Sequence, residues 1–281
     1  MEHFDILIIG AGAAGISAAK GAYQAGCRSI AIADRKESLG GVLLQCSHRG
    51  FGAELSGPEY TAELTKDFPK DIVFFNNTTV LSLSADRTAT LSGGRKLSFR
   101  QLILAAGCRE TALGALPIVG TRPKGTYTAG QMQEMMNLHS YIPQGPVVII
   151  GSGDIGLVMA RQISELGIRT SIVEKEPVCG GMARNRRFLS DGLVELSCSC
   201  TVREIFGREH IEAVRLSDGR RLPCGTLLVA AGLIPEQELV FSLGNPHWLQ
   251  LCGNCKTVHP MVEGVISEGI QAGISAWENM R

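Results

Sequence analysis

Continuous apolar runs, each ending in small residues or glycine, recur at four places in the chain. They cover residues 6–9, 102–106, 147–150 and 227–231. A run that is apolar at every position is typical of a strand buried on both faces, as the central strands of a parallel sheet are. The pattern therefore predicts an α/β fold, and the glycines that end these runs are the first place to look for chemistry.

Three glycines follow the first run at the spacing Gly-x-Gly-x-x-Gly. Gly10 permits a tight turn, Gly12 lets the backbone approach a pyrophosphate, and Gly15 lets the next helix pack closely on the strand. That helix, expected over residues 13–25, would offer the N–H groups and positive dipole of its N-terminus to phosphates. The order of strand, turn and helix predicts a dinucleotide-binding unit.

Such a unit also needs an acid at the end of its second strand. The strand is expected over residues 29–33, and Asp34 follows it, nineteen residues after Gly15. A carboxylate in this position can accept hydrogen bonds from ribose hydroxyls. The complete unit is much stronger evidence for a nucleotide than the glycines alone.

The same motif recurs as Gly151, Gly153 and Gly156, 141 residues after the first set, and its second strand ends at Glu174. Two such units in one chain predict a structural repeat. A carboxylate at Glu174 accepts hydrogen bonds from a ribose diol but repels a 2′-phosphate, which favours NAD over NADP.

The rest of the pattern predicts a scaffold of further helices and strands. We expect helices over residues 54–66, 128–139 and 260–277, short strands between residues 72 and 99, and a domain crossover over residues 108–124. Residues 194–202 alternate strictly, which predicts one strand with Cys198 and Cys200 on its apolar face.

Composition limits the function classes. A chain of 281 residues can hold two domains of ordinary size. Its 27 basic and 27 acidic residues cancel, so capture of nucleic acid or an anionic membrane by charge is not expected. The first strand begins too early for a signal peptide, and no apolar run has the length of a membrane span. We therefore expect a cytoplasmic protein whose nine cysteines are thiols rather than disulfides.

Over essentially its whole length the chain resembles the pyridine nucleotide-disulfide oxidoreductase family, flavoproteins with two dinucleotide domains. A narrower resemblance is to the flavoprotein subunits associated with amino-acid, opine, proline and glycerol-3-phosphate dehydrogenase complexes. It is carried by residues 40–52, by residues 151–161 and by the stretch Cys-Gly-Asn-Cys-Lys-Thr-Val-His at 252–259. The resemblance implies two Rossmann-like domains, with an NAD(H)-binding domain at 113–244 inserted in a discontinuous FAD-binding domain at 1–112 and 245–281.

The resemblance also implies cofactor-binding residues by position. For FAD these are Gly10, Gly12, Ala13, Ala14, Gly15, Asp34, Arg35, Gly41, Val42, Val80, Ala106, Gly107, Gly253, Asn254 and Met261. For NAD they are Gly151, Gly153, Asp154, Ile155, Gly156, Glu174 and Gly232.

Two departures from the family pattern affect these expectations. Asn254 stands where most members have an acid that bonds the flavin ribityl chain; an amide can still bond hydroxyls, but without charge-assisted strength. Only seventeen residues separate Pro235 from Gly253, where family members usually have a longer segment. The shortened tail leaves surface that another subunit can cover.

The chemistry that the resemblance implies is that of an FAD-dependent NAD(H) oxidoreductase. Hydride or electrons would pass between nicotinamide, flavin and a partner subunit or other acceptor. The expected partner is a second flavoprotein dehydrogenase subunit, with a small iron–sulfur protein as a further candidate, and the chain is expected to be part of an oligomer. No metal site is predicted.

The cysteines keep a second hypothesis open. Disulfide reductases of this family carry a Cys-x4-Cys or a Cys-x-x-Cys at set places, and neither is present there. Cys46, with His48 two residues later, is the candidate catalytic pair, although both can instead pack beside the cofactor. A free-standing NADH-dependent disulfide or peroxide reductase would use Cys46, or Cys252 with Cys255. A third hypothesis, motivated by the shortened tail, is a cofactor-bearing structural subunit without catalysis of its own.

Overall fold

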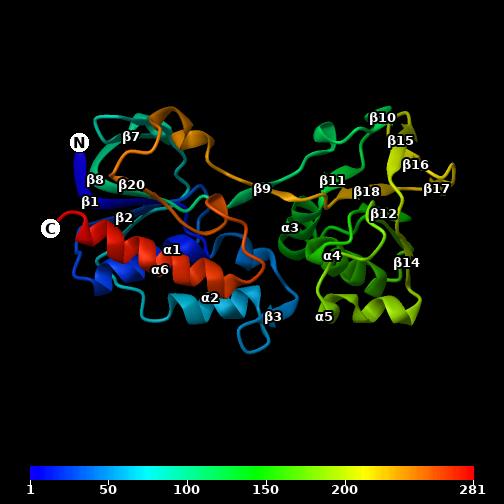
Figure 1. Ribbon diagram of the computed structural model, residues 1–281, viewed down its shortest axis with the longest axis horizontal. Coiled ribbons are helices and arrows are strands. Elements are labelled where there is room, and N and C mark those ends of the chain that lie inside the picture. Colours follow the sequence, from blue (N-terminus) through cyan, green and yellow to red (C-terminus); the bar gives the residue numbers. More distant parts are fainter. The chain divides into compact units, whose positions relative to one another are not determined.

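The computed structural model describes residues 1–281, and the chain divides into two compact units. The first unit contains Met1–Arg109 and Ile234–Arg281, and the second contains Glu110–Leu233 (Figure 1). Each unit contains a mainly parallel sheet with helices, so the predicted α/β fold of two Rossmann-like domains, one inserted in the other, is confirmed. The second break lies earlier than the predicted 244/245, because the segment after it contributes Val240 to the core of the first unit.

A seven-stranded sheet forms the first unit. Its strands are β1 (Glu2–Ile9), β2 (Ile30–Ala33), β5 (Val73–Phe75), β6 (Val80–Ser84), β7 (Thr88–Leu91), β8 (Lys96–Leu104) and β20 (Leu249–Leu251). The order is β5-β2-β1-β8-β7-β6, and β20 pairs with the second half of β8. The strands β5, β2, β1, β8 and β20 run parallel, whereas β6, β7 and the first half of β8 form an antiparallel meander.

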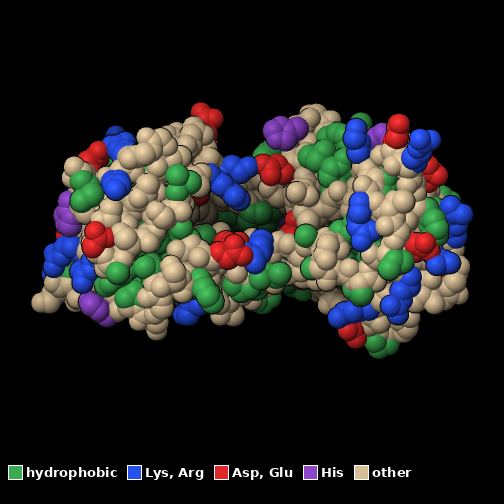
Figure 2. Space-filling model, turned by 90° about the horizontal axis from the view of Figure 1, so that it is seen from above, with side chains coloured by type: hydrophobic (Ala, Val, Ile, Leu, Met, Phe, Trp, Pro, Cys, Tyr) green, Lys and Arg blue, Asp and Glu red, His purple; other side chains and the backbone are tan.

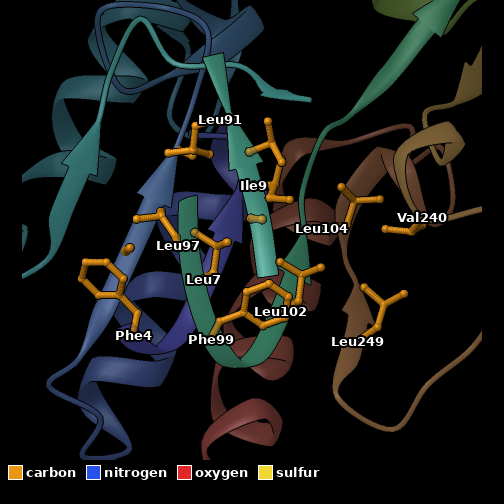
Figure 3. Close-up of a cluster of buried hydrophobic side chains, with 14 of the residues drawn as sticks. Phe4, Leu7, Ile9, Leu91, Leu97, Phe99, Leu102, Leu104, Val240 and Leu249 are labelled. Carbon is orange, nitrogen blue, oxygen red and sulfur yellow. The ribbon is translucent and has the colours of Figure 1, made fainter. Parts of the chain in front are cut away.

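Apolar side chains cover both faces of this sheet. On one face Leu7 of β1, Leu102 of β8 and Leu249 of β20 belong to one cluster (Figure 3). Ile6 and Ile8, the alternate residues of β1, belong to a second cluster that includes helix side chains. The first apolar run is continuous because β1 is buried on both sides.

The helices of the first unit are α1 (Ala13–Gln24), α2 (Gly57–Thr65) and α6 (Val262–Glu278). Helix α6 lies alongside α1 (Figure 1). The two helices approach too closely for a side chain at Gly273, where a Cβ would overlap the carbonyl oxygen of Ala18. The tail is thereby held against the first glycine motif. Helix α6 begins later than the predicted Pro260, with Met261 in the N-cap position.

The second unit repeats this architecture. Its parallel sheet contains β11 (Thr126–Thr128), β12 (Val147–Ile150), β13 (Thr170–Val173), β14 (Val194–Ser197) and β18 (Thr226–Val229), and its helices are α3 (Ala129–His139), α4 (Asp154–Glu165) and α5 (Ala183–Arg186). The order β14-β13-β12-β18 matches β5-β2-β1-β8 of the first unit, with β11 in the place of β20. The structural repeat predicted from the two glycine motifs is confirmed.

A second sheet of this unit corrects one prediction. It contains β10 (Val119–Gly120), β15 (Val202–Gly207), β16 (Ile211–Leu216) and β17 (Arg221–Pro223). The single strand predicted over residues 194–202 is wrong, because β14 ends at Ser197 and Ser199 turns the chain with a φ of 51°. Cys198 and Cys200 therefore lie between two strands; Cys200 is buried in the core, and Cys198 is partly exposed.

Short elements complete the chain. They are β3 (Arg49–Phe51), β4 (Leu55–Ser56), the crossover strands β9 (Cys108–Glu110) and β19 (Leu233–Pro235), which pair with each other, and the 3-10 helices η1 (Gly41–Gln45), η2 (Ser92–Gly94), η3 (Leu113–Ala115), η4 (Arg187–Asp191), η5 (Glu238–Leu243) and η6 (Gly253–Cys255).

Charge is mixed over the surface of both units. Figure 2 shows Lys and Arg side chains interspersed with Asp and Glu side chains on the visible face of each. None of the helices combines the length and the apolar character that a membrane crossing requires.

Candidate functional site

The first glycine loop, residues 10–15, has two crowded glycines and one open glycine. A Cβ at Gly10 would overlap the carbonyl oxygen of Ala105, and a Cβ at Gly15 would overlap that of Gly10. A Cβ at Gly12 would meet nothing within 4 Å. The outer glycines are required by the protein itself, whereas the side-chain position of Gly12 faces open space. A ligand that approaches the backbone there explains why no side chain is present.

The second glycine loop, residues 151–156, has the same division. A Cβ at Gly151 would overlap the carbonyl oxygen of Ala230, and a Cβ at Gly156 would overlap that of Gly151. Gly153, like Gly12, has nothing within 4 Å of its Cβ position. Both loops therefore keep one face of the backbone open at equivalent positions.

Each loop is fastened to the acid at the end of its second strand. Asp34 accepts hydrogen bonds from the Ala11 amide at 2.6 Å and from the Lys36 amide at 2.8 Å, one on each carboxylate oxygen. Because a carboxylate oxygen accepts more than one hydrogen bond, Asp34 retains capacity for ribose hydroxyls.

Glu174 holds the second loop more tightly. Its Oε2 accepts from both the amide and the hydroxyl of Ser152, at 2.8 and 2.7 Å, and its Oε1 accepts from the Glu176 amide at 2.9 Å. Burial alone would raise the pKa of Glu174, but the hydrogen bonds from Glu176 and Ser152 outweigh burial and lower the pKa. The acid is therefore ionised at neutral pH although only 7% of it is exposed.

The helices that follow the two loops have no side-chain caps. In α1 and α4 the N-cap residues are Gly12 and Gly153, and neither helix start receives a side-chain hydrogen bond. By contrast, α2 and α3 each carry a complete capping box, begun by Ser56 and Thr128. A helix start left uncapped beside an open glycine fits the phosphates of a dinucleotide. On these observations the residues present fit one dinucleotide at each loop.

A double glycine lies against the first loop. Gly40 forms an isolated parallel bridge with Gly12, its amide donates to the Ala11 carbonyl at 2.8 Å, and a Cβ at Gly41 would lie 2.9 Å from the Gly12 Cα. The next residue, Val42, is 64% exposed. Gly40 and Gly41 thus lie against the first glycine loop, and the cofactor-binding roles of Gly41 and Val42 stay predictions.

The second loop has a matching double glycine that the sequence analysis missed. The amides of Gly180 and Gly181 donate to the hydroxyl and carbonyl oxygens of Ser152, both at 2.9 Å. Asp154 accepts from the Met182 amide at 2.8 Å and from the Asn185 amide group at 2.7 Å, and so holds the following segment. The signal was available, because each double glycine follows its acid by six and seven residues.

The tail meets the first loop at the turn formed by Gly253 and Asn254. A Cβ at Gly253 would lie 2.6 Å from the Cβ of Ala14, so this turn rests on the start of α1. The Gly253 amide donates to Glu268 at 2.7 Å, and the Asn254 Oδ1 accepts from the His259 amide at 3.0 Å. Glu268 and His259 thus hold the tail turn, and neither was predicted as a site residue.

The remaining predicted cofactor-binding residues differ in how far they are buried. Val80 is buried at the start of β6, and Thr78, two residues before it, donates to the Asp34 carbonyl at 2.8 Å. The exposed residues of the set are Arg35, Ala106, Met261, Ile155 and Gly232, and Ala13 and Gly107 are buried and partly buried, respectively. Their roles stay predictions.

The candidate catalytic thiol is poorly suited to reaction. Cys46 is 8% exposed, its Sγ donates to the Val42 carbonyl at 3.3 Å, and burial raises its pKa to about 12. The ring of His48 packs against Phe51, with 5.2 Å between ring centroids. A thiol with so high a pKa is almost entirely protonated at neutral pH, which disfavours a nucleophilic role for Cys46.

The second candidate pair is more deeply buried. Cys252 and Cys255 have no exposed surface, and burial raises the pKa of both thiols. The Cys255 Sγ donates to the Leu104 carbonyl at 3.0 Å, so it behaves as part of the core below the tail turn. No disulfide joins any of the nine cysteines.

Known proteins resemble this chain in both sequence and fold. The sequence model of the pyridine nucleotide-disulphide oxidoreductase family matches residues 4–251. An opine oxidase subunit from Agrobacterium tumefaciens (strain Ach5) is 28% identical over 280 residues, which cover 86% of this chain and 55% of that protein. Hydrogen cyanide synthase subunit HcnB of Pseudomonas protegens is 27% identical, over 86% of this chain and 59% of that protein. The chain thus spans little more than half the length of these two relatives.

A solved structure with a similar fold is the thioredoxin reductase of T. acidophilum. It superimposes with a TM-score of 0.82 over 100% of this chain and 99% of that one, at 19% sequence identity. The likeness shows that the two chains share a fold.

Proposed function

Since this chain belongs to the pyridine nucleotide-disulphide oxidoreductase family, whose members are FAD-dependent NAD(P)H oxidoreductases, we propose that it exchanges electrons between NAD(H) and a partner subunit through bound FAD. One observation carries the proposal. The polypeptide contains two glycine loops. In each, one glycine has free space at its Cβ position, an acidic side chain is hydrogen-bonded to the loop, and the following helix starts without a side-chain cap.

The first unit is the proposed FAD-binding domain and the second the proposed NAD(H)-binding domain. When bound, the two coenzymes supply the redox chemistry, which is hydride transfer between nicotinamide and flavin. The backbone at Gly12 and Gly153 and the uncapped starts of α1 and α4 would bind the two pyrophosphates. Asp34 and Glu174 would each orient a ribose, and the chain needs no acid–base pair of its own for this work.

NAD is the proposed nicotinamide coenzyme rather than NADP. Glu174 is buried and its pKa is lowered, so it carries a negative charge where a 2′-phosphate would have to lie. The nearest basic side chain in sequence, Lys175, pairs with Glu176 at 3.5 Å. A like charge that is not neutralised in a partly dry site should cost NADP a few kcal/mol of binding energy, on the order of a hundredfold in affinity or more.

The partner is proposed to be a second dehydrogenase subunit in the cytoplasm, with an iron–sulfur protein as a further candidate. Both sequence relatives are named as subunits, and this chain spans little more than half of each. The segment between Pro235 and Gly253 is short, and Phe241 within it is 87% exposed. An exposed aromatic side chain on a shortened segment supports contact with another chain.

The test of the proposal is rapid mixing of the purified, FAD-loaded protein with NADH. The flavin absorbance near 450 nm should decrease on mixing, and the decrease should be much smaller with equal NADPH. A flavin spectrum unchanged at saturating NADH would contradict the proposal. Turnover with an artificial dye as acceptor would exclude the purely structural subunit, which needs its partner for all catalysis.

A disulfide or peroxide reductase is the second candidate, supported by the likeness in fold to a thioredoxin reductase. The burial and raised pKa values of Cys46, Cys252 and Cys255 argue against it. Replacing these cysteines with serine would decide between the two. Unchanged NADH turnover with every acceptor would exclude the reductase.

A further inference from the structure

Two partly exposed cysteines, Cys179 and Cys198, lie beside the acid of the second glycine loop. The Sγ of Cys179 lies 3.8 Å from the carbonyl oxygen of Ser152, whose amide and hydroxyl both donate to Glu174. Cys198 comes directly after β14, whose last residue, Ser197, accepts a hydrogen bond from the Glu174 amide at 2.8 Å. Each cysteine is therefore connected to the acid through a single intervening residue.

The turn that carries Cys198 is also fastened to the loop that carries Cys179. The amide of Ser199 donates to the carbonyl oxygen of Glu176 at 2.9 Å, three residues before Cys179. Burial raises the pKa of Cys198, and so do the negative charges that Cys179, as a thiolate, and Glu174 place near its sulfur. The two thiols thus lie near one another as well as near the acid.

The repeat in the first unit shows where a side chain at the position of Cys198 points. Ser199 and Asn77 are equivalent, because each has a left-handed φ and donates its amide to the loop after the acid. Cys198 therefore corresponds to Asn76, whose side chain donates to the Glu37 carbonyl oxygen at 3.3 Å. Glu37 belongs to the loop after the acid of the first unit. In the second unit the same loop carries the other thiol.

We propose that Cys179 and Cys198 are a redox-modified pair, which a low-molecular-weight disulfide oxidises to an intramolecular disulfide that weakens NAD(H) binding. The proposal rests on the NAD(H)-binding role of the second unit. Both sulfurs are free thiols in the structure, so bond formation draws their two segments together. Because both segments hold Glu174, their movement displaces the carboxylate from the position in which it would orient a ribose.

The oxidation is a thiol–disulfide exchange. The thiolate of Cys179 attacks one sulfur of the small disulfide, whose S–S bond breaks, so that a mixed disulfide forms and one small thiolate leaves. Cys198 then loses its proton and attacks the Cys179 sulfur of the mixed disulfide, which releases the second small thiolate. The pair gives up two electrons and two protons, and the small disulfide takes up both and ends as two thiols. The raised pKa of Cys198 favours Cys179 as the first nucleophile.

The test is oxidation of the purified protein with glutathione disulfide, followed by calorimetric titration with NADH. Oxidised wild type should bind NADH roughly tenfold more weakly than reduced wild type, and dithiothreitol should restore the affinity. Mass spectrometry of peptides prepared without reductant should find Cys179 and Cys198 in one cross-linked pair. Glutathione attached to either residue without the cross-link would overturn the proposal, as would a cross-link that leaves the NADH affinity unchanged.

A double variant and a matched control assign the effect to this pair. Cys179→Ser/Cys198→Ser has neither thiol, so its NADH affinity should be the same before and after oxidation. Cys108→Ser removes the partly exposed thiol of the first unit and should still lose affinity as wild type does. A wild-type loss of affinity in the double variant, or no loss in Cys108→Ser, would contradict the proposal.

The outcome does not depend on whether the variants fold. The cross-link and its effect on NADH affinity are measured on wild type, and thermal unfolding in reductant reports the folding of each variant separately. Reduced wild-type protein that binds no NADH would refute the proposed function itself. Reduced protein that binds NADH and keeps its affinity after oxidation would refute only the role of the thiol pair.

Discussion

Ser152 donates twice to a single atom of Glu174, with its amide at 2.8 Å and its hydroxyl at 2.7 Å from Oε2. In the first unit the equivalent residue, Ala11, donates to Asp34 with its backbone amide alone, because its side chain has no donor. The Ser152 hydroxyl also accepts from the Gly180 amide at 2.9 Å, so one side chain connects the acid with the second double glycine. The two repeats thus use the same plan, and the second adds a hydroxyl that orients its acid.

Replacing Ser152 with alanine should weaken the NADH site without altering the chemistry. The change removes a buried hydrogen bond to a charged group, which contributes about 1.5–3 kcal/mol, and leaves the Gly180 amide without its acceptor. We expect the KM for NADH to rise about tenfold or more while kcat stays within twofold, because uniform binding is lost. Steady-state kinetics with a dye acceptor measures both constants.

Ser164→Ala is the matched control for that variant. Its hydroxyl is also buried, but it bonds only to the Arg161 carbonyl within α4. A similar rise in KM in both variants would show that loss of any buried hydroxyl of the second unit disturbs the site, and would contradict a specific role for Ser152.

The two glycines of the second loop should respond oppositely to alanine. The Cβ position of Gly153 is open, and its φ of −64° suits any residue, so Gly153→Ala should leave the thermal unfolding midpoint of the apoprotein within about 2 °C of wild type. The added methyl group would occupy the space proposed for the pyrophosphate, so the dissociation constant for NADH should rise at least tenfold. Calorimetric titration with NADH and thermal unfolding measure the two effects separately.

Gly156→Ala supplies the contrast. Its Cβ would overlap the Gly151 carbonyl oxygen, so the backbone must move and the free energy of unfolding should fall by about 1–3 kcal/mol. Full stability of Gly156→Ala, or unchanged NADH binding by Gly153→Ala, would contradict this division between glycines required by the fold and glycines required by a ligand.

Much of this fold could be predicted because two kinds of local pattern determine it. The apolar run at residues 6–9 must be buried on both faces, and the glycines at 10, 12 and 15 permit the turn and the close helix. The repeat at 151–156 could be recognised by its spacing alone. These signals depend on neighbours in sequence, which is why Asp34 and Glu174 could be assigned to the ends of their strands.

What could not be predicted depends on contacts between distant segments. Residues 194–202 alternate like a strand, but amides of Ser199 and Cys200 donate to the carbonyls of Glu176 and Glu174 and turn the chain. The pairing of Glu268 with the Gly253 amide joins positions fifteen residues apart through a helix whose start was itself misplaced. The role of the Ser152 side chain could not be predicted from the residues next to it in sequence, because its partners Glu174 and Gly180 come from two other loops.

Acid should destabilise the protein through Glu268. Its folded-state pKa is below the ordinary value of 4.5, so its contribution to stability is fully present above pH 4.5 and is lost as pH falls through the folded-state pKa. Thermal unfolding of apoprotein from pH 7 to 3.5 should show Glu268→Gln less stable than wild type at neutral pH, with the difference shrinking below pH 4.5. Glu278 takes no part in the contacts of Glu268 with Gly253, Lys256 and His259, so Glu278→Gln should follow wild type. A difference between Glu268→Gln and wild type that stays constant with pH would contradict the assignment.

Thiol reactivity should separate two classes of cysteine and decide whether the tail carries a working dithiol. Cys252 and Cys255 are completely buried with raised pKa values, so at pH 8 neither forms an appreciable thiolate at the surface. A chromogenic disulfide reagent should label the partly exposed Cys108, Cys179 and Cys198 first and leave this pair unmodified until the protein unfolds.

Changing both buried residues to alanine should then leave NADH turnover within twofold of wild type. The expected cost is in stability alone, about 1 kcal/mol for each small cavity and a lost hydrogen bond to Leu104. Mass spectrometry of labelled peptides identifies the reacting thiols. Two results would contradict this expectation: rapid labelling of Cys252 or Cys255 in the folded protein, or loss of turnover in a double variant that still binds FAD. Either result would support electron transfer through a dithiol in the tail. Burial alone would then not explain why two cysteines lie next to the proposed flavin-binding turn.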